Sequence, residues 1–178
     1  MASWSSRGLR GSMLEESLNM TNEKYRREKL ALVQKIPTPI TPMEFDKEHH
    51  HITLAYFEQK STVDYLGNVQ GIPICFDAKE CAAESFPLQN IHPHQVEFMT
   101  EFEQQQGIAF LIIYFSRQDM YYYVPYRDMM QFWRRAESGG RKSFRREELD
   151  PEYQIAVHGQ VFIHYLEILQ KDLESRED

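Results

Sequence analysis

The chain has 178 residues, of which 42% are hydrophobic and 26% are charged, and this is enough for one globular domain with its own core. The longest apolar run, residues 108–115, is too short to cross a bilayer, and the N-terminus lacks the apolar core of a signal peptide, so we expect no membrane contact. Cys75 and Cys81 form no disulfide or metal-thiolate pattern, which favours the reducing cytoplasm. The formal net charge of −7 argues by itself against nucleic-acid binding, but Arg and Lys are concentrated at residues 134–146, so the charge total does not decide the question.

The N-terminal part is expected to consist of a disordered tail and one helix. Residues 1–11 are rich in Ser, Arg and Gly, a composition that is typical of disorder. Ser12 and Glu15 fit a capping box, with Ser12 at the N-cap and Glu15 at N3, so a helix is predicted from residue 12 to about residue 29. Its apolar face is formed by three residues, Leu14, Leu18 and Tyr25.

Residues 36–60 are predicted to form a protruding hairpin or arm that is not part of the core. A strand is expected to begin within residues 30–34, before three prolines that interrupt regular structure, Pro37, Pro39 and Pro42. The segment then contains acids, the triplet His49-His50-His51 and a β-like run at residues 52–57. The triplet is typical of an exposed loop, with adventitious metal binding as the alternative.

The elements after residue 92 alternate between helices and strands. A helix is predicted over residues 93–106, with Pro93 at its first position and Gly107 at its end. The continuous apolar run 108–115 predicts a central buried strand. Shorter elements follow it, a strand at residues 120–124, a helix at 126–135, a short strand at 155–157 and an amphipathic helix at 161–173. This order predicts a single mixed α/β domain with a central sheet at residues 12–178.

Two acids and a lysine make residues 61–80 the candidate site. Residues 72–79 read as a strand, in which Asp77 and Lys79 point to the same face because side chains alternate. Asp64 is expected at the end of a neighbouring strand, and the turn between the two strands is expected at Gly67-Asn68 and Gly71. Three charged groups would then converge.

This arrangement fits metal-assisted cleavage of a phosphodiester. Two carboxylates hold Mg²⁺ or Mn²⁺ through hard oxygen ligands, and the metal polarises the phosphate and lowers the pKa of a bound water. Lys79 would stabilise the charge that develops in the transition state. The alternative is that Asp64, Asp77 and Lys79 are surface charges on strands, although the apolar residues in the same strand favour a half-buried position.

Several other polar residues have two interpretations each. Glu15 is either the capping acid or a member of the site. Gln95 is either a polar helix residue or a donor to a phosphate or to a metal-bound water. His92 and His94 are typical of a solvent-exposed helix start, with a metal site as the alternative. The cluster at 134–146 is either a solvated loop or a contact surface for backbone phosphates.

The aromatic residues around the predicted sheet are interpreted mainly as core. Tyr121, Tyr122 and Tyr123 lie in the strand at residues 120–124, and Trp133 lies in the helix at 126–135. Stacking on nucleic-acid bases is the alternative for this group.

Short motifs are spread over nearly the whole chain after residue 8. They are Arg10-Gly11, Leu14-Glu15, Leu18-Asn19, Thr21-Asn22, Pro37-Thr38-Pro39, Ser61-Thr62, Asp64-Tyr65, Phe76-Asp77-Ala78-Lys79-Glu80, Ser85-Phe86-Pro87-Leu88-Gln89-Asn90, His92, His94-Gln95 and Gly140-Arg141-Lys142-Ser143. In this order and at nearly this spacing, they resemble the RecU-type Holliday junction resolvases, a branch of the PD-(D/E)xK nuclease superfamily.

The resemblance implies a fold and a set of site residues. The fold would be restriction-endonuclease-like, a mixed central β-sheet flanked by helices, with a protruding stalk at residues 36–60 that enters the centre of the junction. Mg²⁺, with Mn²⁺ as a substitute, would be bound by four residues, Thr62, Asp64, Asp77 and Gln95. Lys79 would stabilise the transition state, and Glu15 would be the helix acid that points at the site.

The resemblance also implies partners. The substrate would be a DNA four-way junction, cut in homologous recombination and DNA repair by a homodimer with one active site per subunit. The family is further linked to RecA and to the RuvAB branch-migration machine. Two features depart from the family pattern. Asp77 stands where Glu is usual, and the stalk carries acids and histidines where a basic arm is expected.

Three functions remain open from the sequence. The first is a junction-resolving endonuclease. The second is a non-catalytic protein that keeps the nuclease fold and binds junctions or a recombinase. The third is a related nuclease that acts on another DNA structure. A panel of linear duplex, flap, fork and junction DNA separates the first from the third, and metal-binding calorimetry separates the first from the second.

Overall fold

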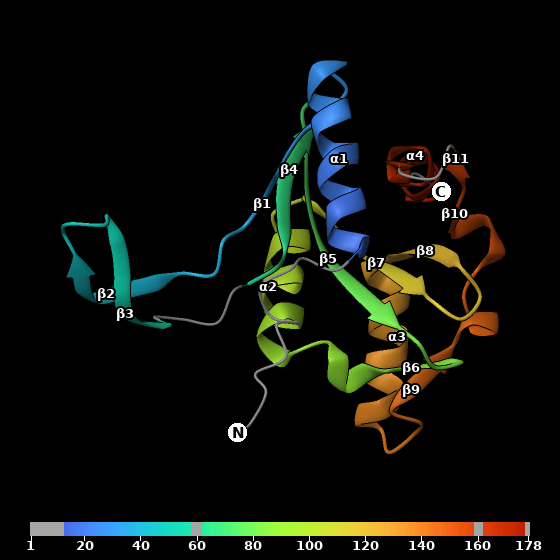
Figure 1. The fold of residues 1–178 in the computed structure, drawn as a ribbon. Coiled ribbons are helices and arrows are strands. Elements are labelled where there is room, and N and C mark those ends of the chain that lie inside the picture. Colours follow the sequence, from blue (N-terminus) through green and yellow to red (C-terminus); the bar gives the residue numbers. More distant parts are fainter. Residues whose placement is uncertain (1–12, 58–61, 159–161, 177–178) are drawn as a thin grey trace.

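The structure is a computed structural model that describes residues 13–57, 62–158 and 162–176 (Figure 1). A six-stranded sheet forms its centre, with the strand order β1-β4-β5-β7-β8-β10. The strands are β1 (Leu32–Lys35), β4 (Tyr65–Val69), β5 (Ile72–Cys81), β7 (Ile108–Phe115), β8 (Met120–Pro125) and β10 (Gln154–Ile155). The pair β5 and β7 is parallel and the other neighbours are antiparallel, so the sheet is mixed as predicted.

Helices cover both faces of the sheet. Helices α1 (Met13–Arg27) and α4 (Tyr165–Glu174) pack on one face, and α2 (Pro93–Gln104) and α3 (Tyr126–Glu137) pack on the other (Figure 1). All eight residues of β7 are buried, because its side chains alternate between the two helical layers, which confirms the prediction of a central strand. None of the described helices is long and apolar enough to cross a membrane.

Parallel pairing of β5 with β7 requires a connection that returns to the same end of the sheet. Helix α2 supplies it and packs against both strands. The chain reaches α2 through β6 (Ser85–Pro87) and the single 3-10 turn η1 (Leu88–Asn90), and β6 pairs with β9 (Ser143–Arg145) in a separate small sheet. The remaining short elements are η2 (Arg146–Glu148), η3 (Pro151–Tyr153), β11 (Val157–His158) and β12 (Phe162–Ile163).

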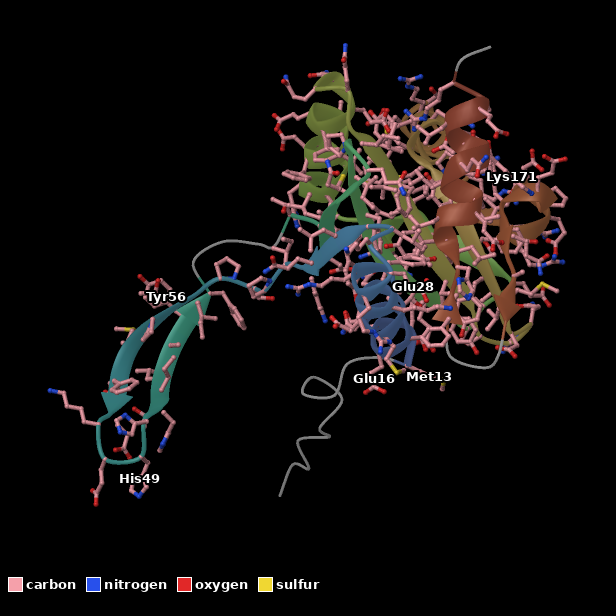
Figure 2. The ribbon with its side chains drawn as sticks, turned by 90° about the horizontal axis from the view of Figure 1, so that it is seen from above. Met13, Glu16, Glu28, His49, Tyr56 and Lys171 are labelled. Carbon is pink, nitrogen blue, oxygen red and sulfur yellow. The ribbon has the colours of Figure 1, made fainter. Side chains whose placement is uncertain are left out.

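A two-stranded hairpin stands away from the body of the molecule (Figures 1 and 2). It consists of β2 (Ile40–Asp46) and β3 (His51–Phe57), with His49 near its tip. The arm predicted at residues 36–60 is therefore confirmed over its described part, while residues 58–60 lie outside the described ranges. Pro42 does not interrupt the strand as predicted, because it lies in β2 beside an irregularity in the register with β3.

Several predicted boundaries were wrong for local reasons. The helix predicted over residues 93–106 ends at Gln104, and the residue with left-handed backbone is Gln106, with φ 64°. Gly107 is needed for space instead, because a Cβ there would lie 2.2 Å from the Phe102 ring. Gly67 lies inside β4 instead of in the turn, because the backbone of β1 approaches it too closely for a side chain.

The C-terminal helix also begins later than predicted. It starts at Tyr165, since Phe162 and Ile163 form a short strand whose Ile163 N–H donates to the Thr21 hydroxyl (2.9 Å). The predicted start at residue 161, like the predicted cap Ser12 of the first helix, lies outside the described residues. Helix α1 itself begins at Met13, with Leu14, Leu18 and Tyr25 buried as predicted.

Candidate active site

Asp64 and Asp77 are brought together by the antiparallel pairing of β4 with β5. Tyr65 pairs with Phe76, so the residue before β4 lies opposite the middle of β5. The backbone N–H of Asp64 donates to Asp77 Oδ1 (3.1 Å), and the backbone N–H of Ala78 donates to Asp64 Oδ2 (2.9 Å). Each carboxylate is thus held by the other strand, in agreement with the predicted convergence.

Asp77 is fully buried, which is unusual for a carboxylate. It points toward α2 because Cys75, on the same face of β5, belongs to the hydrophobic cluster beneath that helix. Burial, and then the neighbouring charge of Asp77, raise the pKa of Asp64 to about 7, while the N–H of Ala78 and the charge of Lys79 act in the opposite direction. The pair therefore carries more negative charge than the protein alone stabilises.

Lys79 and Gln95 complete the surroundings of Asp77. Lys79 Nζ lies 2.5 Å from Asp77 Oδ2 and 3.3 Å from Gln95 Oε1. The Gln95 amide donates to both oxygens of Asp77, each at 3.0 Å. The face shared by Asp77 and Lys79 is the one predicted from the strand period.

The orientation of Gln95 follows from its neighbours. Its Oε1 accepts from the backbone N–H of His92 (3.0 Å), in a capping box at the start of α2, which leaves its NH₂ group for Asp77. In this state Gln95 holds Asp77 in place. Direct ligation of a metal by Gln95 would need the amide to turn, so that role stays a prediction.

The donor set fits a hard divalent cation. Two carboxylates converge with the amide of Gln95, and Thr62 lies half-buried two residues before Asp64. Magnesium and manganese prefer such oxygen ligands, and a cation would offset the charge that raises the Asp64 pKa. Among residues 13–57, 62–158 and 162–176, no group of three or more His, Cys, Asp or Glu is arranged for a metal, so ligands beyond the acid pair would come from other groups or water.

Glu15 forms an ion pair with a residue that sequence reasoning had not singled out. Its carboxylate is 2.6 Å from Lys35 Nζ, in an ion pair between α1 and β1. Sequence reasoning missed Lys35, because the pairing of β1 with β4 that brings it near Asp64 has no signal in a four-residue strand. The next residue, Ile36, donates its N–H to the backbone oxygen of Asp64 (2.8 Å). A catalytic role for Glu15 remains a prediction.

The other candidates lie around the start of α2, at the tip of the hairpin and in the basic cluster. The rings of His92 and His94 stack with centroids 5.4 Å apart. At the hairpin tip, His49 Nδ1 lies 3.0 Å from Asp46 Oδ2. In the basic cluster, Arg135 and Arg141 both form ion pairs with Glu148, and Arg146 forms one with Glu147. The positive charge of the cluster is therefore partly neutralised.

The comparisons of sequence agree on one family. The family model described as Recombination protein U matches residues 9–171. A Holliday junction resolvase RecU from Bacillus cereus (strain B4264) is 43% identical over 145 residues, which are 79% of this chain and 72% of the relative. A Holliday junction resolvase RecU from Limosilactobacillus reuteri (strain DSM 20016) is 37% identical over 172 residues, 94% of this chain and 84% of the relative. Among solved structures, Hjc, a Holliday junction resolvase from Archaeoglobus fulgidus, has a TM-score of 0.41 at 9% identity and covers 66% of this chain and 78% of its own.

Proposed function

Since the chain belongs to the RecU family of recombination proteins, we propose that it is an endonuclease that resolves Holliday junctions in homologous recombination and DNA repair. The chemical basis of the proposal is the arrangement of three charged side chains. Asp64, Asp77 and Lys79 converge on the face of the sheet that α2 covers, with Asp77 fully buried. A surface cluster of strand charges would not leave a carboxylate without solvent.

The acid pair is the proposed holder of a divalent cation, which we propose is Mg²⁺, with Mn²⁺ as a substitute. When bound, the cation supplies polarisation of the scissile phosphate and a water of lowered pKa. Asp64 and Asp77 provide its carboxylate oxygens, and Thr62 and Gln95 are the proposed further ligands. Asp77 stands where the family usually has Glu, so its side chain is shorter by one methylene. The two backbone N–H groups that fix the acid pair support the proposal that Asp77 can still hold the cation.

Lys79 is the proposed transition-state residue. Its ammonium is half-enclosed and lies against Asp77, so its position is fixed before the substrate arrives. A preorganised cation at this point stabilises the negative charge that develops on the phosphate oxygens. Gln95 limits the freedom of both side chains, since it contacts Asp77 through its amide and Lys79 through its oxygen.

The hairpin supports the proposal of a homodimer. Phe45, Ile52, Leu54 and Tyr56 are exposed by 41–53%, although they lie on a two-stranded element that has no core of its own. An isolated hairpin is at most marginally stable in water, and a second copy would cover these side chains. Phe45→Asp should shift the protein from dimer to monomer in sedimentation analysis, whereas Lys47→Asp at the exposed tip should not. A dimer that survives Phe45→Asp contradicts this assembly.

The nuclease proposal is tested with a synthetic four-way junction. Asp64→Asn and Lys79→Ala should each abolish cleavage while junction binding stays measurable. Glu80→Gln is the matched control, because Glu80 is the exposed neighbour of Lys79 on the opposite face of β5. Full cleavage by either site variant would overturn the proposal.

A DNA panel and a binding assay test the substrate and the partners. Linear duplex, flap and fork DNA of the same sequence should be cut more slowly than the junction, and equal rates on all four would indicate a different nuclease. Loss of the Mn²⁺ or Mg²⁺ binding heat in Asp77→Ala would support the metal site without reference to activity. Association with RecA and with RuvAB remains a prediction, which co-sedimentation with each purified protein would test.

A further inference from the structure

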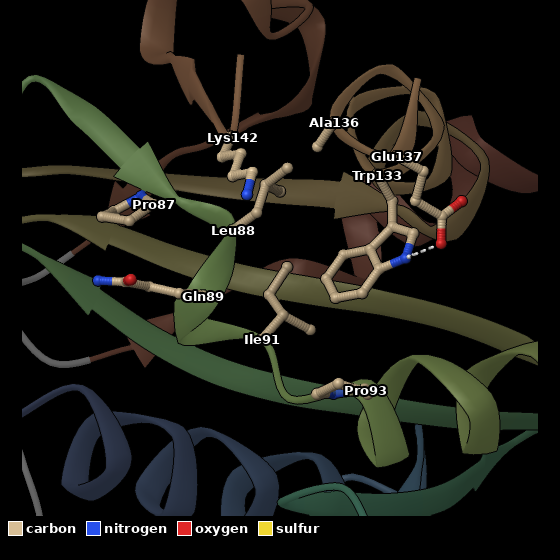
Figure 3. A pocket seen from close by; sticks show the side chains of 9 residues that line it. All are labelled: Pro87, Leu88, Gln89, Ile91, Pro93, Trp133, Ala136, Glu137 and Lys142. Carbon is tan, nitrogen blue, oxygen red and sulfur yellow. Dashed lines mark hydrogen bonds between the residues drawn. The ribbon is translucent and has the colours of Figure 1, made fainter. Parts of the chain in front are cut away.

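A pocket of about 700 Å³ opens beside the candidate active site, between the start of α2 and helix α3 (Figure 3). Its walls are mainly apolar. Leu88 and Ile91 come from the segment that leads into α2, and the indole of Trp133 comes from α3. Figure 3 shows the indole beside Ile91 and the ammonium of Lys142 near Leu88. The volume falls within the usual range of about 300–1,000 Å³ for small-molecule pockets.

The wall that carries Lys142 is fixed by the backbone. Gly139 has φ 85°, and the N–H of Gly140 donates to the Arg135 oxygen (2.9 Å) as the chain leaves α3. A Cβ on Gly140 would lie 2.7 Å from that same oxygen, so the tight turn requires glycine. The backbone oxygen of Lys142 then accepts from the N–H of Leu88 (3.0 Å). The pocket is therefore preformed.

The pocket has one cation, Lys142, that a negative group of its occupant could contact. Its one acidic lining residue, Glu137, accepts a hydrogen bond from the Trp133 indole N–H (3.1 Å). Lys142 forms no ion pair with any residue in the described ranges, in contrast to Arg135 and the other paired arginines of the cluster. An apolar wall with an aromatic plane and a free cation fits a planar ring that is joined to a negative group.

The pocket is also close to the acid pair. Pro93 lines it, and Gln95, two residues later, donates to Asp77. The two residues are about 3 Å apart along the helix axis and, at 3.6 residues per turn, point to different sides of the first turn of α2. A DNA strand whose phosphate lies at Asp77 and Lys79 would therefore reach the pocket by passing around the start of α2.

We propose that this pocket receives an unstacked nucleobase of the junction, which stacks on Trp133 while a flanking phosphate contacts Lys142. The proposal rests on the proposed function, because it names a feature of the same substrate at the same site. At an opened branch point, a base pair has a stacking neighbour on one side only, and a base leaves a stack at least cost where pairing or stacking is already interrupted. Stacking on an aromatic side chain accepts any base, so the pocket selects the branch and not the sequence.

The first experiment tests whether Trp133 stacks on one particular base of the junction. Single abasic sites are placed in turn at the nucleotides that flank the branch point of a synthetic junction, and binding is measured in EDTA so that no strand is cut. At one position the wild-type protein should lose roughly tenfold in affinity, the effect expected for one stacked base. Trp133→Ala should bind the intact junction with the same loss and show no further loss at that abasic site, whereas Trp133→Phe should retain the sensitivity.

The second experiment isolates Lys142. Lys142→Ala should lower the slope of log K against log salt by about one, as expected for one lost phosphate contact. Lys171→Ala is the matched control, because Lys171 lies on α4 at the opposite face of the sheet, and it should leave the slope unchanged. In a Trp4→Phe background, Trp133 is the one indole left, and its emission should be quenched when the junction binds.

The outcomes separate this proposal from the proposed function. If the wild-type protein cuts junctions but no abasic position weakens binding, or if Trp133→Ala keeps the full abasic effect, the pocket does not hold a base. The same conclusion follows if the emission of Trp133 is unchanged at saturation. If the wild-type protein neither binds nor cuts junctions, the proposed function fails first, and this proposal fails with it.

Discussion

Replacing Gln95 with leucine removes the two hydrogen bonds that its amide donates to the buried carboxylate of Asp77. Leucine has a similar size, so packing beneath α2 is largely kept, and Lys79 still neutralises Asp77. The backbone N–H of His92 also loses its side-chain acceptor, but His92 is exposed and water can replace that bond. The loss is therefore mainly that of hydrogen bonds to a charged group without access to solvent.

The expected decrease in the free energy of unfolding is about 2–3 kcal/mol, since a hydrogen bond to a charged group contributes about 1.5–3 kcal/mol. With a urea m-value of about 2–3 kcal/mol/M, the midpoint of unfolding should fall by about 1 M. Divalent-metal affinity, measured by calorimetry, should fall about 10–100-fold, as is typical when a group that orients a ligand is removed.

Gln104→Leu is the matched control for this variant. Gln104 lies at the end of the same helix and is exposed, so the same chemical change should alter the free energy of unfolding by less than about 0.5 kcal/mol. If Gln95→Leu unfolds at the same urea concentration as Gln104→Leu and binds metal like the wild type, then Gln95 does not hold Asp77 and the proposed geometry is refuted.

Three further predictions concern charges and thiols away from Gln95. Asp172→Ala should lower the free energy of unfolding by about 3–5 kcal/mol in thermal denaturation, because it leaves Arg127, Arg176 and the hydroxyl of Tyr123 without a buried carboxylate. Glu97→Ala, at an exposed position of α2, should change little. Burial and the charge of Asp77 raise the pKa of Asp64 to about 7, so in EDTA the folded protein binds more protons than the unfolded chain between about pH 4 and 7. Its free energy of unfolding should therefore decrease as the pH rises through this window. Asp64→Asn should abolish that decrease. Burial also raises the pKa of the Cys75 thiol, so in a Cys81→Ser background Cys75 should react with a thiol reagent at pH 8 only after urea is added; prompt reaction of the folded protein would contradict its position.

The sequence predicted most of the sheet because its strongest signals are local. The apolar run 108–115 and the alternation in residues 72–79 each specify burial without reference to the rest of the chain, and β7 and β5 lie there. Pro93 likewise marked the start of α2. Elements of two residues, such as β12, depend on contacts with distant parts of the chain and gave no comparable signal.

The site was predicted in part for the same reason. Spacing alone placed Asp77 and Lys79 on one face, and the pairing of β4 with β5 then brought Asp64 to them. The hydrogen bonds of Gln95 and the ion pair of Glu15 with Lys35 could not be read from spacing, because they depend on how α2 and α1 are docked on the sheet.

The segment that leads into the hairpin is bonded to the body next to the candidate active site. Ile36, in this segment, donates its N–H to the backbone oxygen of Asp64 (2.8 Å). This bond ties the start of the hairpin segment to the peptide group of a proposed catalytic acid. A displacement of the hairpin relative to the body would therefore act on the backbone that carries Asp64.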